Sequence, residues 1–174
     1  MPLVAAGLQS ELIDIYEKGP KGNPSPQIVG LKTAKAYMNF CSAGMNAGGH
    51  PFTAMPGASA LGQDLGDIYN SVSPAPALTA QKMAKAFDSC LATWLSLFQN
   101  TIITAPGLPG LIAGLVDVFS KPNPSTTLFA TKLAKELNTY TLSAIVIGVT
   151  PDTPGVPFTA VSYTHLTLPT IYSV

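Results

Sequence analysis

The sequence predicts an all-α protein of three repeated antiparallel helical hairpins, about six helices, packed as one bundle or a short array with an irregular C-terminal tail. Two observations support this prediction. The segment Lys-x-Ala-Lys occurs at residues 32–35, 82–85 and 132–135, at a constant spacing of 50 residues. Around each copy, apolar residues recur at helical spacing, and prolines and glycines separate the apolar stretches.

The repeat extends beyond the lysines. Pro56-Gly57 recurs fifty residues later as Pro106-Gly107, and an aspartate recurs once in each copy. The N-terminal copy is partial and is offset by 53 residues. We therefore expect one helical domain over residues 1–160. Its three repeats cover about residues 3–50, 54–104 and 105–150.

The first predicted hairpin begins with a helix over residues 3–17, which ends at the glycines and prolines of 19–24. Ser25 then offers an N-cap and Pro26 a first helical residue. The second helix of this hairpin is expected to end near residue 45, where glycines follow.

The second predicted hairpin joins a helix at about 58–70 to a longer one at about 76–100. Ser73-Pro74 repeats the capping signal before the longer helix. One face of the longer helix is apolar and the opposite face is polar, which is typical of a helix packed on a core. Its expected core residues are Phe87, Leu91, Trp94 and Leu95, and Phe98 continues the same face.

The third predicted hairpin joins a helix at about 108–120 to one at about 126–147, which Ser125 can cap. The end of the last helix is ambiguous. The stretch 144–149 is rich in β-branched residues and could be extended instead. The helical alternative follows from analogy with the second hairpin.

The C-terminal segment lies outside the repeat. Residues 161–170 resemble a run found at the ends of many unrelated metagenomic reading frames, which arises by read-through into sequencing-adaptor sequence. The resemblance implies that the tail, 161–174, is not native sequence. A short strand or extended tail is the alternative interpretation.

The composition is unusual in its low charge. Only 10% of the residues are charged, and nine basic residues balance nine acidic ones. This balance gives no basic stripe for a nucleic-acid partner, and low charge near neutrality favours association. Cys41 and Cys90 are expected to be buried and reduced, with a disulfide as the less favoured alternative.

The sequence predicts no catalytic, cofactor-binding or metal-binding residues, and no cofactor. His50 and His165 lack partners at metal-ligand spacing, so each is expected to be solvated. The recurring aspartates, Asp14, Asp67 and Asp117, are expected to pair with a repeat lysine or to cap a turn. The recurring lysines are either a solvated face or contacts to a neighbouring subunit. These candidate partner-contact residues are Lys35, Lys85 and Lys135.

The most apolar stretch, residues 102–119, is interrupted by Pro106 and Pro109. It therefore falls short of the roughly 20 uninterrupted apolar residues that a spanning helix needs, and no membrane span is predicted.

The opening residues 1–9, Met-Pro-Leu-Val-Ala-Ala-Gly-Leu-Gln, together with the Lys-x-Ala-Lys helices, resemble the small virion structural proteins of T4-like tailed phages of marine bacteria. The resemblance implies a non-enzymatic subunit of the virion, made in the host cytoplasm. Its expected partners are other virion proteins and further copies of itself. The alternatives are a helical adaptor or binding module, a membrane-active lysis or pore protein, and an enzyme of unrecognised type.

Overall fold

The computed structural model describes residues 5–18, 25–44, 50–71, 75–96, 101–149 and 157–161. Six helices form the body of the described part of the chain, in three pairs of one short and one long helix. They are α1 (Ala5–Glu17), α3 (Pro26–Ser42), α4 (Ala58–Asn70), α5 (Pro76–Leu91), α6 (Leu108–Ser120) and α7 (Thr126–Leu142). The prediction of an all-α fold built from three helical hairpins is confirmed.

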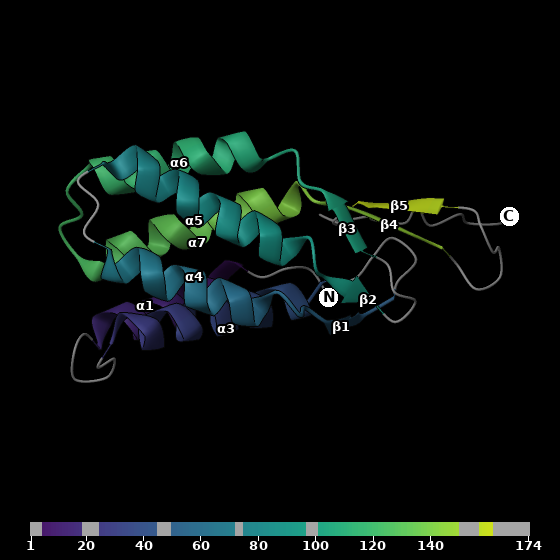
Figure 1. The fold of residues 1–174 in the computed structure, drawn as a ribbon, viewed down its shortest axis with the longest axis horizontal. Coiled ribbons are helices and arrows are strands. Elements are labelled where there is room, and N and C mark those ends of the chain that lie inside the picture. The colour runs from purple at the N-terminus through teal and green to yellow at the C-terminus, as the bar shows by residue number, and fades with distance from the viewer. Residues whose placement is uncertain are drawn as a thin grey trace, which may run out of the picture.

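The six helices close into a ring. Each helix packs against the helix before it and the helix after it, and α7 packs back onto α1. The helices lie along the long axis of the molecule, with the connections inside each hairpin at one end (Figure 1). The repeats therefore form one closed bundle, a choice that the sequence had left open.

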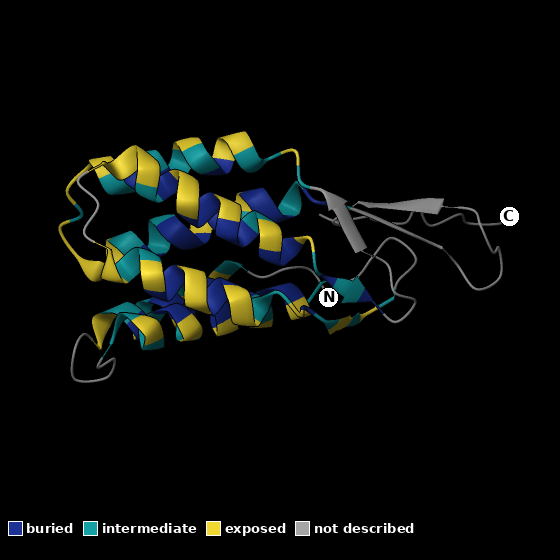
Figure 2. Cartoon of the chain, in the orientation of Figure 1, coloured by how far each residue is buried: buried dark blue, intermediate teal, exposed yellow. Residues whose placement is uncertain are grey.

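The ring has approximate three-fold symmetry. Helices α4 and α6 begin and end 50 residues apart, and α3, α5 and α7 begin 50 residues apart. Residues 33–35, 83–85 and 133–135 share one pattern in which two buried residues are followed by an exposed lysine. Figure 2 shows the result, with the ribbon of buried residues coloured dark blue on the inner faces of the helices and that of exposed residues coloured yellow on the outer faces.

Two of the three long helices begin at the capping serines that the sequence predicts. The hydroxyl oxygens of Ser25 and Ser125 accept hydrogen bonds from the backbone amides of Ile28 and Leu128, at 3.3 and 3.1 Å. Helix α5 begins at Pro76 after Ala75, which provides no side-chain cap. The capping residue expected there, Ser73, lies outside the described residues.

A hydroxyl group ties the two ends of a hairpin together in the second and third repeats. The backbone amides of Gly57 and Gly107 donate to the hydroxyl oxygens of Thr93 and Ser143, each at 2.9 Å. A Cβ atom at Gly107 would lie only 2.4 Å from the Ser143 hydroxyl oxygen. The Pro-Gly repeat thus marks a close contact that requires glycine.

Side chains of the long helices meet in the centre of the ring. The rings of Tyr37 and Phe87 pack edge to face with 4.9 Å between their centroids. The indole nitrogen of Trp94 donates to the carbonyl oxygen of Cys41 at 3.2 Å. Residues 37, 87 and 137, which are equivalent in the repeat, are fully buried.

A sheet extends the ring at one end. Two of its strands begin at residues that were predicted to be helical, so two predicted helix ends are wrong. Helix α5 ends at Leu91 rather than near 100, and α7 ends at Leu142 rather than near 147. The hydroxyls of Thr93 and Ser143 bond the carbonyl oxygens of the last helical turns, at 2.7 Å in each case, and the chain then becomes extended.

The strands pair in chain order as an antiparallel meander. They are β1 (Phe52–Ala54), β2 (Leu95–Ser96), β3 (Thr101–Thr104), β4 (Ile145–Val149) and β5 (Pro157–Val161).

Phe87, Leu91 and Trp94 are core residues as predicted, whereas Leu95 is only half-buried on β2. Phe98 lies outside the described residues.

Helices α3 and α4 approach each other closely. A Cβ atom at Gly30 would lie 2.4 Å from the carbonyl oxygen of Gly62 and 2.5 Å from the amide nitrogen of Gly66. The residues equivalent to Gly30 in the other repeats are Ala80 and Ala130. This pair of helices is therefore packed through glycine in a way that the other two repeats do not copy.

Candidate functional site

The predicted partner-contact lysines are all exposed, but the fold does not bring them together. Lys35 lies on α3, Lys85 on α5 and Lys135 on α7. Each belongs to a different hairpin of the ring. The three lysines are thus three separate surface positions with different neighbours.

Among the described residues, two of the three repeated aspartates form the same ion pair, and the third does not. Asp14 forms an ion pair with Lys18 at 2.6 Å, and Asp117 forms one with Lys121. The hydrogen bond from Lys121 is the main reason why the pKa of Asp117 lies below its usual value. Each of these lysines follows its aspartate by four residues and lies just past the end of the helix, so neither is a Lys-x-Ala-Lys residue. In α4 the matching position is Ser71, whose hydroxyl donates to the carbonyl oxygen of Ile68 at 3.0 Å.

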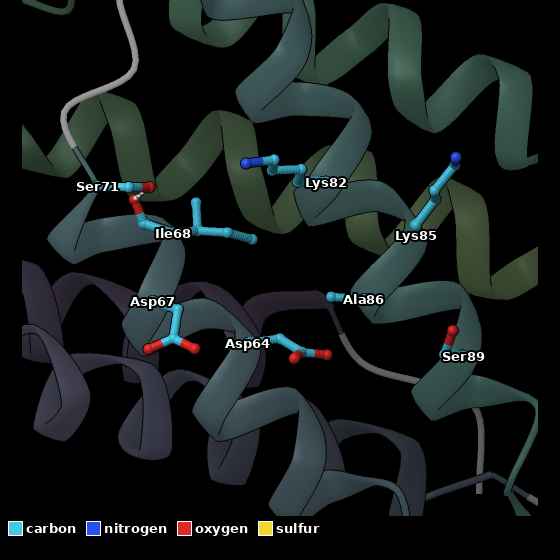
Figure 3. Close-up of a pocket in the computed structure, with 8 residues that line it drawn as sticks. All are labelled: Asp64, Asp67, Ile68, Ser71, Lys82, Lys85, Ala86 and Ser89. Atoms are coloured by element: carbon cyan, nitrogen blue, oxygen red, sulfur yellow. Dashed lines mark hydrogen bonds between the residues drawn. The ribbon is translucent and has the colours of Figure 1, made fainter.

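A groove of about 480 Å³ lies between α4 and α5 on the outside of the second hairpin. Each helix supplies residues at helical spacing, so that one stripe from each helix faces the groove. In Figure 3, Asp64 and Asp67 lie on the α4 side, and Lys82 and Lys85 lie on the α5 side. The lining is completed by Ile68, Ser71, Ala86 and Ser89.

The four charged groups of this groove are exposed and unpaired. Asp64, Asp67, Lys82 and Lys85 form no ion pair or side-chain hydrogen bond within the described part of the chain. The groove therefore presents one acidic wall and one basic wall to its surroundings. We refer to the residues Asp64, Asp67, Lys82 and Lys85, with the groove between them, as the charged face.

The matching surfaces of the other hairpins are bridged or filled. In the first hairpin, the amide nitrogen of Asn39 donates to the Glu11 carboxylate at 3.2 Å, which links α3 to α1. In the third hairpin, the carboxylate of Glu136 lies directly over Gly114. At the positions of Ala86 and Ser89 the first hairpin has Ala36 and Asn39, and the third has Glu136 and Thr139. Only the second hairpin lacks both the Asn39 amide and the Glu136 carboxylate, so its groove stays open.

The two cysteines belong to the interior of the ring. Cys41 and Cys90 are free thiols and buried, as expected. Burial raises the pKa of both thiols, to about 12 for Cys90. A protonated thiol is a poor nucleophile and a poor metal ligand, so these cysteines are packing residues.

No cluster of three or more potential metal ligands occurs among the residues that the structure describes. His165 is outside those residues. In the described ranges, no helix has the length and apolar character needed to cross a membrane.

Comparisons of the chain with protein-family models, with curated proteins and with solved structures found no match.

Sequence reasoning identified Lys85 but missed the groove beside it. The signal was a difference between repeats rather than a shared residue. Ser71 replaces the lysine that pairs with the aspartate in each of the other copies, and Ala86 replaces the Glu136 of the third repeat. A position-by-position comparison of the repeats would have shown that Asp67 lacks the lysine four residues later that Asp14 and Asp117 have.

Proposed function

We propose that this chain is a non-enzymatic structural subunit of a phage particle, which acts by self-association or by docking on other virion proteins. The resemblance of residues 1–9 and of the Lys-x-Ala-Lys helices to virion proteins of T4-like phages supports the assignment to a particle. The proposal holds for a subunit of the capsid, neck, tail or baseplate.

The observation that carries the proposal is the charged face. Exposed opposite charges that have no partner within the described part of their own chain are suited to pairing with groups on another chain. A closed ring of six helices presents such a face on a rigid body, so little ordering is needed when the subunit binds. The low overall charge, 10% of residues with a net charge of zero, also favours association.

Mass spectrometry of purified particles tests the proposal. We expect peptides of this chain at a stoichiometry of several copies or more per particle. Absence of the chain from particles, together with measurable turnover of any substrate, would contradict it.

A helical adaptor is the second candidate, because the same groove could hold a peptide. An adaptor would be monomeric when purified and would be absent from the particle.

A further inference from the structure

We infer that the charged face is a docking surface for a second copy of this chain, related to the first copy by a two-fold axis that runs along the groove. The inference rests on the proposed function, because it names the surface and the partner through which the subunit would self-associate. It begins from the four unpaired charges of α4 and α5 and from the symmetry that their order allows.

The charge pattern is complementary to itself under one orientation of the axis. A two-fold axis parallel to the groove places α4 of one copy opposite α5 of the other. The acidic wall of each copy then faces the basic wall of its partner. A two-fold axis lying across the groove would set aspartates against aspartates and lysines against lysines, which is repulsive. Charge therefore selects the first arrangement.

The order of the charges along the groove is preserved in this arrangement. Because α4 and α5 are consecutive helices of one hairpin, Asp67 and Lys82 both lie toward the end marked by Ser71, whereas Asp64 lies toward the end marked by Ser89 (Figure 3). An axis parallel to the groove leaves these heights unchanged. Lys85 lies between Lys82 and Ser89 along α5, further toward the Ser89 end than Lys82 (Figure 3). Asp67 of one copy would thus meet Lys82 of the other, and Asp64 would meet Lys85.

Apolar contacts accompany the charges. Leu78 lies one helical turn before Lys82 on the same stripe of α5, and it is 46% exposed. Ile68 is half-buried within the groove itself. Individual ion pairs at a surface contribute little, so the leucine and isoleucine supply apolar area while the charges fix the orientation.

Two further observations favour a second copy over an unrelated partner. The net charge of the chain is zero, so two copies approach each other without long-range repulsion. One surface also carries both of the charges that must meet, because α4 supplies the acidic residues and α5 supplies the lysines. Two copies of the same surface can therefore pair with each other. A strongly acidic or strongly basic partner would satisfy only one wall and would be repelled by the other.

The test uses two charge-reversal variants of the full chain, D64K/D67K and K82E/K85E, whose masses are measured by sedimentation over a range of concentrations. The wild type should form a dimer. Each variant carries like charges on both walls, so its self-association should weaken by about tenfold or more. An equimolar mixture of the two variants should associate again. In the mixed dimer each wall of the all-basic variant faces a wall of the all-acidic variant.

The control variant is K35E/K135E, which changes the net charge by the same amount as K82E/K85E. Its two lysines are the residues equivalent to Lys85 in the other two hairpins, and they lie outside the charged face. It should dimerise like the wild type. Circular dichroism confirms that each variant is folded, and the mixing experiment requires both variants to be folded. A wild type that is monomeric throughout, a mixture that fails to associate, a control that loses association, or a larger assembly overturns the inference.

The outcome is separable from that of the proposed function. A chain that is monomeric alone but present in particles at several copies contradicts the two-fold contact and leaves the proposed function standing. A chain that dimerises through these charges but is absent from particles supports the contact and contradicts the virion role.

Discussion

Tyr37 and Thr141 are hydrogen-bonded in the centre of the ring, with 2.8 Å between their hydroxyl oxygens, although 104 residues separate them in the chain. The Thr141 hydroxyl donates its own hydrogen to the carbonyl oxygen of Leu137 at 2.8 Å. Since a hydroxyl has one hydrogen to donate, Tyr37 must be the donor of the bond between the two side chains. This bond connects the first hairpin to the third.

Replacement of Tyr37 by Phe should lower the free energy of unfolding by about 1 kcal/mol. The aromatic ring remains packed on Phe87, and Thr141 keeps its bond to Leu137, so only the hydroxyl contribution is lost. Urea unfolding measures the change. Tyr37→Ala also removes the ring and should cost roughly 3–5 kcal/mol. An equal loss of unfolding free energy in the two variants would mean that packing of the aromatic side chain of Tyr37 does not stabilise the fold.

Replacement of Phe87 by Ala should cost roughly 3–5 kcal/mol, because the side chain is fully buried and the remaining cavity is lined by apolar groups. Leu128→Ala is the control, since Leu128 is 37% exposed on α7. Its loss should be about 1 kcal/mol or less. Thermal or urea unfolding of both variants tests the assignment. A small loss for Phe87→Ala would place that residue outside the core.

Replacement of Gly30 by Ala should destabilise the fold by about 1–3 kcal/mol, because the added methyl group would meet the backbone of α4 at two points. The matched control is Gly110→Ala in α6, where a Cβ atom would have nothing within 4 Å. That variant should gain about 0.5–1 kcal/mol from helix propensity. The prediction is wrong if the two variants change stability in the same direction.

The fold should lose stability in alkaline solution. Burial raises the pKa of six groups, namely Cys41, Cys90, Tyr16, Tyr37, Tyr69 and Tyr140. Above about pH 8 the unfolded chain releases these protons, cysteines first near about 8.5 and tyrosines near about 10, whereas the folded chain retains them. The unfolded state then binds fewer protons, so the free energy of unfolding falls as pH rises. Stability should thus be constant up to about pH 8 and should decline steadily above it.

Chemical unfolding between pH 7 and 11, with a reductant present, measures this decline. The C41A/C90A variant lacks the two thiols, so its decline should begin about one pH unit higher than in the wild type. A free energy of unfolding that stays level up to pH 11 would contradict the prediction.

The helices could be predicted because the repeat and the apolar spacing agree, whereas the ends of the long helices could not. Leu91, Trp94 and Leu95 continue the apolar pattern of α5 through the point where the helix stops. The Thr93 hydroxyl bonds the nearby carbonyl oxygen of Cys90, but it also accepts a hydrogen bond from the backbone amide of Gly57, and β2 pairs with β1. The contacts with Gly57 and with β1 are distant in sequence, so the apolar pattern of α5 does not contain them. The β-branched run after Ala144 was the visible sign of the same transition in the third repeat.

The charged face could be anticipated only in part. Its lysines belong to the repeat, and their exposure follows from the amphipathic pattern. Among the described residues Asp67 has no ion-pair partner, because Ser71 stands where the other repeats have a lysine. The groove is open because Ala86 is small and because of the spacing of two packed helices. Closure of the ring could not be predicted, because it depends on the angle between successive hairpins.

The contact of α1 with α7 fixes how many hairpins the protein can hold. The amide of Gln9 on α1 donates to the Thr131 hydroxyl on α7 at 3.1 Å, and Tyr16 packs edge to face on Phe129 with ring centroids 5.1 Å apart. In an open solenoid a hairpin can be gained or lost at an end while its neighbours stay in place. Here a fourth hairpin would separate α1 from α7, and a missing one would leave two buried surfaces in water. Evolution can vary the loops and the surface of such a chain, but it cannot change the number of repeats by one without remaking the whole core.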